Sequence, residues 1–250
     1  MAVFKASLLN EFEKLYKKKK ATAAVFLSLA VIVAGQLIVL AVRSGLGLRG
    51  TGSLEFPILV LSVVMKTVLP LFVAWVAIDS FSGEFAQNSM RITLTRPTSR
   101  LKVFAAKFGA ILLFISSMLG LLLIFSLAAG FVFNANSATA GALFRTALAY
   151  AVSLLPLAVL ALGIVLLANV FKSGISVFFL SILLFIVFKA VALYFYSYAA
   201  LFMTTQLEWY NLFLIDSVPW GRVIRQFLIM LGSGIMLFTA GFYLFDKKEF

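Results

Sequence analysis

Six long apolar runs dominate this sequence and constrain its fold more than any other feature. They lie near residues 22–42, 57–78, 104–130, 148–168, 176–197 and 223–245. At about 1.5 Å per residue, a helical run of about 20 residues crosses the roughly 30 Å hydrocarbon layer of a bilayer. A charged fraction of 12% and a mean hydropathy of +1.11 do not fit a water-soluble core of this length. The sequence therefore predicts an all-α, polytopic membrane protein with six transmembrane helices and both termini on the same side.

Basic residues are distributed unevenly over the segments that flank these runs. One set of segments carries Lys5, Lys14, Lys17, Lys18, Lys19, Lys20, Arg91, Arg96, Arg100, Lys102, Lys107, Lys172, Lys247 and Lys248. The alternate segments carry Arg43, Arg49, Arg145, Arg222 and Arg225. Because segments rich in lysine and arginine stay in the cytoplasm, we predict cytoplasmic termini and a cytoplasmic loop over 79–103. The same rule makes the cluster 17–20 a topological anchor, with docking of anionic lipid or a partner as the alternative. The net charge of +12 thus reflects topology and not nucleic-acid binding.

The residue inventory argues against an enzyme. Cysteine and histidine are absent, which removes disulfides, thiolate and imidazole metal ligands, and imidazole acid–base catalysis. No Walker A sequence occurs, and Lys172-Ser173 lacks the glycines that cradle a phosphate. Gly45, Gly47 and Gly50 have the spacing of a dinucleotide loop, but they lie between two expected spans, without the strand and helix of such a site. We expect no catalytic activity, cofactor or metal in this chain.

Two segments outside the spans are predicted to lie at the membrane surface. Within 1–20, Phe4, Leu8 and Phe12 recur at helical spacing and most charged residues occupy the rest of the helix, which is typical of an interfacial helix. Residues 198–222 are too apolar for a solvated loop and too interrupted to span, so we expect short helices on the outer surface. No repeat or linker divides residues 1–250, and we treat them as one transmembrane domain.

Three residues inside the expected spans have special consequences. Pro70 and Pro156 predict bends, which neighbouring helices must compensate. Lys66 lies near the middle of the second run, where a charge costs about 2.5–3.5 kcal/mol.

Lys66 and Lys189 are the candidate residues of a translocation pathway. Each could face a water-filled path and contact an acidic cargo, pair with a carboxylate of a partner subunit, or extend its ammonium group to the interface. No carboxylate of the chain itself is expected at membrane depth, since Glu55 and Asp79 fall at span ends.

The passage 79–100 is the one sizeable polar connection that combines an amphipathic segment, a proline turn and several arginines. Phe81 and Phe85 are four residues apart, and Glu84 and Asn88 form an adjoining stripe, which predicts a short amphipathic helix. Apolar side chains beside charges suit a groove on a soluble partner. The alternative is that the phenylalanines insert into lipid headgroups.

This passage and the chain ends resemble the ABC-2 type permeases, the membrane subunits of ATP-binding-cassette exporters. The resemblance is carried by Leu69 to Glu84, Leu94-Thr-Arg-Pro-Thr-Ser-Arg100, Lys107, Asn10-Glu11-Phe12-Glu13-Lys14-Leu15 and Phe245-Asp246-Lys247-Lys248. At Gln87-Asn88-Ser89 the chain departs from the Gly-Thr step of many relatives.

The resemblance implies a dimer of permease chains, identical or similar, each bound to a separately encoded ATPase that holds ATP and magnesium. Residues 80–95 would form a coupling helix between spans two and three. The residues expected to contact the ATPase are Phe81, Ser82, Glu84, Phe85, Asn88, Arg91, Arg96 and Arg100. Closure of the ATPase pair would push this helix and tilt the two spans.

Two functional hypotheses follow. The first is a permease of the bacterial cytoplasmic membrane that exports a hydrophobic or amphipathic substrate such as a peptide antibiotic; the small subgroup it looks like includes bacitracin and lantibiotic self-protection systems and a sodium-efflux system. The second is a membrane sensor or scaffold whose cytoplasmic loop binds a signalling protein without transport.

Overall fold

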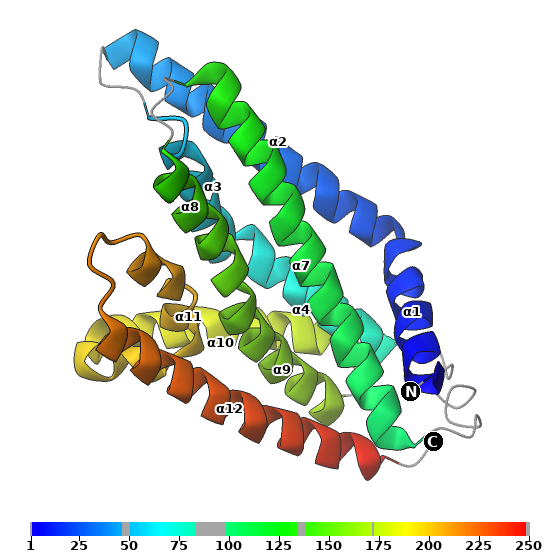
Figure 1. The fold of residues 1–250 in the computed structure, drawn as a ribbon. Helices are drawn as coiled ribbons and strands as arrows, with labels where there is room; N and C mark the ends of the chain where they lie inside the picture. Colours follow the sequence, from blue (N-terminus) through cyan, green and yellow to red (C-terminus); the bar gives the residue numbers. More distant parts are fainter. Residues whose placement is uncertain (1, 47–50, 84–98, 135–138, 172, 249–250) are drawn as a thin grey trace.

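The computed structural model describes residues 2–46, 51–83, 99–134, 139–171 and 173–248, and every regular element in these ranges is a helix (Figure 1). The α-helices are α1 (Ala2–Tyr16), α2 (Lys19–Leu46), α3 (Glu55–Lys66), α4 (Val68–Ser80), α7 (Arg100–Phe133), α8 (Ala140–Val152), α9 (Leu154–Val170), α10 (Gly174–Tyr194), α11 (Met203–Gln206) and α12 (Trp220–Asp246). Two short 3-10 helices are η1 (Tyr196–Leu201) and η2 (Trp209–Phe213).

Five helical stretches are long and apolar enough to cross a membrane. They are Ala21–Ser44, Arg100–Phe133, Ala140–Val170, Gly174–Tyr194 and Trp220–Asp246. A sixth span results if α3 and α4 count as one, because together they pass the same test but are bent by 47° at their junction. The stretches coincide with the six apolar runs of the sequence, so a multi-pass helical membrane protein is confirmed in its general form.

Both interruptions within spans have the same cause. Proline cannot donate a backbone hydrogen bond to the carbonyl four residues earlier, and its ring crowds that carbonyl. For Pro70 that carbonyl belongs to Lys66, where α3 ends; for Pro156 it belongs to Val152, where α8 ends. The bend predicted at Pro70 is therefore confirmed, whereas α8 and α9 remain one continuous span across Ser153.

The long helix α7 is the centre of the arrangement and packs against α1, α2, α3, α9 and α12. At one end its backbone approaches the residues that precede α3 so closely that a β-carbon on Gly130 would lie 2.2 Å from the carbonyl oxygen of Ser53. The Tyr150 hydroxyl of α8 links the same region, donating to the Pro57 carbonyl at 2.8 Å and lying 3.1 Å from the Ser126 hydroxyl. These contacts pin α3, α7 and α8 together at that end.

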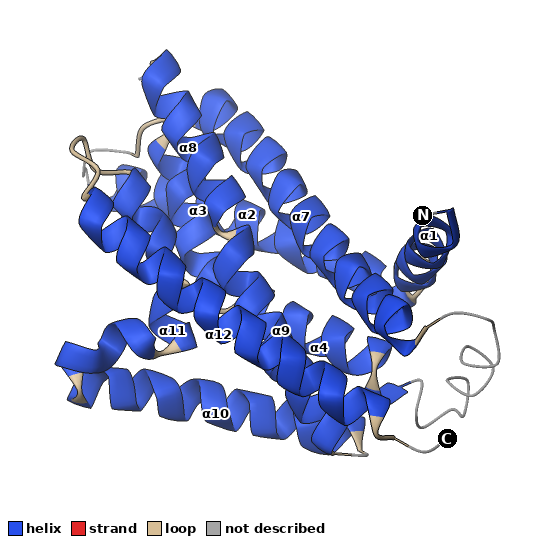
Figure 2. Cartoon of the chain, turned by 60° about the horizontal axis from the view of Figure 1, so that its bottom comes forward, coloured by secondary structure: helices blue, strands red, loops and turns tan. Residues whose placement is uncertain are grey.

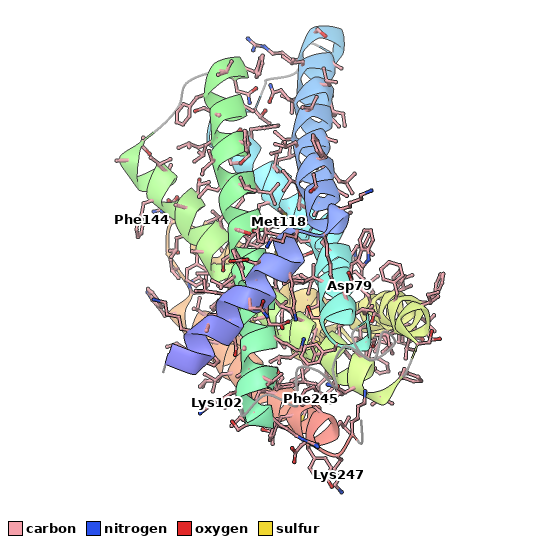
Figure 3. The ribbon with its side chains drawn as sticks, turned by 90° about the vertical axis from the view of Figure 1, so that its right-hand side faces the viewer. Asp79, Lys102, Met118, Phe144, Phe245 and Lys247 are labelled. Atoms are coloured by element: carbon pink, nitrogen blue, oxygen red, sulfur yellow. The ribbon has the colours of Figure 1, made fainter. Side chains whose placement is uncertain are left out.

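The opposite end gathers elements that are distant in sequence. Figure 1 places the N-terminus, the start of α7, the end of α4 and the C-terminal end of α12 on the same side of the molecule. Figure 3 shows α1 crossing α7 near this end, with Asp79, Lys102, Phe245 and Lys247 labelled around it. We call it the termini end; it also carries both flanks of the segment 84–98, whose own residues lie outside the described ranges.

The segment between α10 and α12 forms short helices as expected, but it does not simply cover the outside of the bundle. Leu207, Trp209, Tyr210 and Phe213 are buried, and η2 packs against α8 and α12. Helix α11 packs against α9 and α10. The segment therefore folds back between the helices and brings polar residues into contact with the bent span.

Candidate functional site

Phe81, which lies shortly before the segment 84–98, is part of a buried aromatic cluster. The Phe81 ring lies 5.4 Å from Phe104 of α7 and 6.0 Å from Phe245 of α12, both edge to face. All three side chains are fully buried. Edge-to-face aromatic pairs add about 0.5–1.5 kcal/mol to the burial of the rings. The cluster thus ties the end of α4 to the start of α7 and the end of α12.

Ser82 continues this anchorage. Its hydroxyl is buried and donates to the Ala168 carbonyl of α9 at 3.1 Å. Phe81 and Ser82 were both expected to touch an ATPase, but in this arrangement their side chains face the interior of the chain. The other expected contact residues Glu84, Phe85, Asn88, Arg91 and Arg96 lie outside the described residues.

The far flank of the segment is tied to the C-terminus. Arg100, the first residue of α7, donates through Nη1 to the Asp246 carbonyl and to the Lys248 carbonyl at 3.4 Å. The same nitrogen lies 3.9 Å from the Asp246 carboxylate. Arg100 is partly exposed at the termini end, which is compatible with the contact expected of it.

The N-terminal helix is held against α7 by a buried ion pair. Lys107 Nζ lies 2.9 Å from Glu11 Oε2, the Lys107 side chain is completely buried and that of Glu11 is 10% exposed. Lys14 contacts the other carboxylate oxygen at 2.9 Å. Burial raises the pKa of the Glu11 carboxyl, but the ammonium groups of Lys107 and Lys14 outweigh that effect and hold the pKa below its ordinary value of 4.5.

This placement corrects two sequence-based assignments. The charged residues of 1–20, which include Glu11, were assigned mostly to the polar face of an interfacial helix, and Lys107 was assigned to the basic segments that flank the spans. Both residues are buried where α1 crosses α7. The Tyr16 and Ser117 hydroxyls are also in contact across this crossing. A further ion pair joins Lys18 to Asp79 at 3.5 Å, so the start of α2 is linked to the end of α4.

A second ion pair lies at the bend of α3 and α4. Lys66 Nζ is 2.9 Å from Glu208 Oε1, a residue between α11 and η2. The expectation that Lys66 has no carboxylate partner within the chain is therefore wrong. It failed because Glu208 was placed in an outer surface loop, whereas the fold brings that segment back to the bend. Both side chains remain accessible from outside, by 39% for Lys66 and 46% for Glu208.

A cavity of about 460 Å³ adjoins Lys66. Helices α4, α9 and α10 form most of its wall, and α11 and α12 complete it. Apart from Lys66, Thr67, Ser181 and Thr204, its lining side chains are apolar. The volume falls within the range of about 300–1,000 Å³ that is typical of small-molecule sites. The structure places Lys189 elsewhere, exposed on α10 and outside the lining of this cavity.

Comparison with protein families now decides the class of this chain. A family model described as ABC-2 family transporter protein matches residues 7–192. The match covers most of the chain, from α1 almost to the end of α10.

The chain belongs to the ABC-2 transporter family.

ABC-2 family members are membrane components that generally pair with an ABC ATPase subunit and are not themselves ATPases. The match includes Glu11, Lys66, Lys107 and both flanks of the segment 84–98, whereas Glu208 and Asp246 lie beyond it. No curated protein matches the sequence significantly. The comparisons thus support the permease class for this chain.

Sequence reasoning missed Glu208, the pairing of Asp246 with Arg100 and the buried position of Lys107 in this ABC-2 chain. One local signal was available for Lys107, since it lies seven residues inside a continuous apolar helix and so needs a partner. No local signal identifies the pairing of Glu208 with Lys66 or of Asp246 with Arg100, because each pair joins residues more than a hundred positions apart in the sequence.

Proposed function

We propose that the chain is the permease subunit of a bacterial ABC exporter, driven by a separate ATPase that contacts residues 84–98 and Arg100. One observation carries the proposal: both flanks of that segment are tied to other helices at the termini end. The α4 flank is joined to α2 through Lys18 and Asp79, and to α7 and α12 through Phe81. The α7 flank is joined to α12 through Arg100.

These contacts would transmit a force on the segment 84–98 to the membrane-spanning helices. A force that displaced residues 84–98 would act on α4 and α7 together, and through them on α1 and α12. Glu84 and Phe85 would contact the ATPase. Phe81 and Ser82, which pack against other helices, would transmit the motion of the ATPase to the spans. Two permease chains would form the working unit in the bacterial cytoplasmic membrane, with both termini in the cytoplasm.

The substrate proposed is hydrophobic or amphipathic, such as a peptide antibiotic, drawn from the bilayer. The spans carry few fixed charges, which does not suit a small, strongly hydrated ion. Lys66 and Lys189 are the residues proposed to contact the substrate along the translocation pathway. Of the two, Lys66 has the stronger support because it adjoins an apolar cavity.

The coupling proposal is tested by purifying the chain with its ATPase and measuring ATP turnover. We expect Glu84→Ala and Phe85→Ala to lower the turnover while the two subunits are still recovered together. Leu183→Ala, on the exposed surface of α10, serves as the matched control. Unchanged hydrolysis in both variants would remove the coupling assignment, and recovery of a signalling protein in place of an ATPase would favour the scaffold hypothesis.

The orientation is tested with single cysteines, since the chain contains none. Lys17 and Asp216 are both well exposed; Lys17 lies between α1 and α2, and Asp216 lies in the connection before α12, which the predicted topology assigns to the opposite side of the membrane. A membrane-impermeant maleimide added to intact cells should label Asp216→Cys and leave Lys17→Cys unlabelled. The reverse pattern would place the segment 84–98 outside and contradict the proposal.

A further inference from the structure

The cavity beside Lys66 extends along two neighbouring helices, α9 and α10. Its lining on α10 extends from Ser181 to Phe188, and on α9 from Leu160 to Leu167. Each of these stretches is about 10 Å long at the helical rise of 1.5 Å per residue. Helix α10 lies along the edge of the bundle (Figure 2), and 11% of its apolar window is buried. The cavity could therefore hold an apolar chain, such as the acyl chain of a lipid, lengthwise beside α10.

The polar groups of the lining are not equally available. The Ser181 hydroxyl donates to the Val177 carbonyl at 2.7 Å, and the Thr67 hydroxyl donates to the Val63 carbonyl at 2.7 Å. By contrast, the buried Thr204 hydroxyl has no hydrogen-bond partner among the described residues. Buried polar groups without a partner are rare and call for a ligand group or a water. Among the polar lining residues, Lys66 and Thr204 are therefore the two whose polar groups are not bonded to a backbone carbonyl of their own helix.

Only one member of the Lys66–Glu208 ion pair lines the cavity, and that member sets the sign of the charge there. Lys66 lines it, whereas Glu208 contacts Lys66 but is not among the lining residues. A lysine ammonium has three donor hydrogens, so pairing with one carboxylate leaves donors for a second acceptor. The cavity wall therefore presents positive charge and hydrogen-bond donors to a ligand.

We propose that this cavity binds an amphiphile with an anionic head and an apolar chain. The head accepts hydrogen bonds from Lys66 and Thr204, and the chain lies along α10 between the apolar walls. Glu208 is the counterion that neutralises Lys66 when the ligand is absent and competes with the head when it is present. Binding requires this chain alone, so it stands or fails separately from coupling to an ATPase.

Two sources supply this chemistry, a free long-chain carboxylic acid or an anionic phospholipid of the bilayer. Radiolabelled palmitate measures the first in detergent solution, with hexadecanol as an uncharged competitor of equal chain length. Native mass spectrometry of the purified chain with added phosphatidylglycerol measures the second. Retention of phosphatidylglycerol that Lys66→Met abolishes identifies the bilayer as the source; lysine-dependent binding of palmitate alone identifies the free acid.

Three variants and a control test the geometry. Lys66→Met should weaken palmitate binding about tenfold or more, the factor expected when a charge-assisted hydrogen bond is lost, and Thr204→Val should weaken it less. Glu208→Gln should strengthen binding, because it removes the competing carboxylate. Lys102→Met is the matched control, an exposed lysine of α7 outside the cavity lining, and should bind as the unmodified chain does.

The expected gain in Glu208→Gln protects the test from misfolded variants, because a damaged protein does not bind more tightly. Equal binding of palmitate and hexadecanol would overturn the proposal, since no head group would then be recognised. Wild-type affinity in Lys66→Met would overturn it as well. Weaker palmitate binding in a well-folded Glu208→Gln would contradict the role of Glu208 as a competing counterion and would also overturn the proposal.

Discussion

Two ion pairs of this chain have the same 2.9 Å separation and opposite surroundings. Glu11 and Lys107 are sealed between α1 and α7, with the lysine side chain fully buried. Lys66 and Glu208 lie at a helix bend beside a cavity, and more than a third of each side chain is accessible. The comparison shows that the nitrogen–oxygen distance of an ion pair does not by itself determine its role. Burial decides whether the pair holds helices together or remains available to a ligand.

The physical reason is the cost of an unpaired charge. When one member of a buried pair is removed, the other remains in an apolar site with its solvation lost, and the cost is about 3–5 kcal/mol. When one member of a pair that is accessible to water is removed, the remaining charge is still screened, and the effect is about 0–1 kcal/mol. The two pairs should therefore separate clearly by mutation.

The largest effect is expected for Lys107→Met. The variant leaves Glu11 buried with only Lys14 beside it, and should lower the free energy of unfolding by about 3–5 kcal/mol, measured by denaturant unfolding in detergent. The double variant Glu11→Gln, Lys107→Met should recover part of this loss, because no buried charge then remains unpaired. A double variant that is as unstable as the sum of the single ones would break the comparison.

A smaller effect is expected from pH. Because the pKa of Glu11 is lower in the folded chain than its ordinary value of 4.5, the carboxylate contributes stability that is fully present above that value. The contribution is lost as the pH falls through the lower folded-state pKa. Thermal unfolding between neutral and acidic pH should show this loss, and Glu11→Gln should flatten the curve in that window. An unchanged pH profile in the variant would assign the acid sensitivity to other carboxylates.

Lys66→Met should change the free energy of unfolding by only about 1 kcal/mol or less, under the same conditions as Lys107→Met. The two variants replace the same residue type by the same residue, so the contrast isolates the surroundings. A loss as large as that of Lys107→Met would show that Lys66 and Glu208 form a structural tie, and would end the distinction between the pairs.

The smallest effect is expected for Lys17→Ala. Its pair with Glu13 spans 3.3 Å at the C-terminal end of α1, and both side chains are largely exposed. Such pairs within one helix contribute about 0.3–0.5 kcal/mol, so the unfolding midpoint should stay close to that of the unmodified chain. A clear destabilisation would indicate that α1 contributes to the stability of the folded chain through more than its contact with α7.

Local features of this chain were well predicted from sequence. The membrane-spanning stretches follow from runs of apolar residues, and the interruptions at Lys66 and Val152 follow from the prolines four residues later. The segment 198–222 was correctly predicted to contain short helices. The burial of Trp209 and Tyr210 was not predicted, because it results from packing against other helices, which no local pattern encodes.

The candidate site was predicted only in its parts. Lys66 was selected from its charge within an apolar run, and that choice led to the cavity. Its partner Glu208 was missed, because the pairing depends on the segment after α10 folding back to the bend. Phe81 was expected at a protein interface from its spacing with Phe85, but spacing cannot distinguish a side chain that faces a partner from one that faces the core.

The sequence by itself determined that this chain enters a membrane as a set of helices, where those helices break, and to which family it belongs. These properties depend on the hydrophobicity and backbone chemistry of neighbouring residues, or on short motifs. Only the tertiary structure decided which charges are sealed and which are accessible, and where a cavity remains. Burial is a property of packing between segments far apart in the chain, and it sets the energy of a charge in a protein.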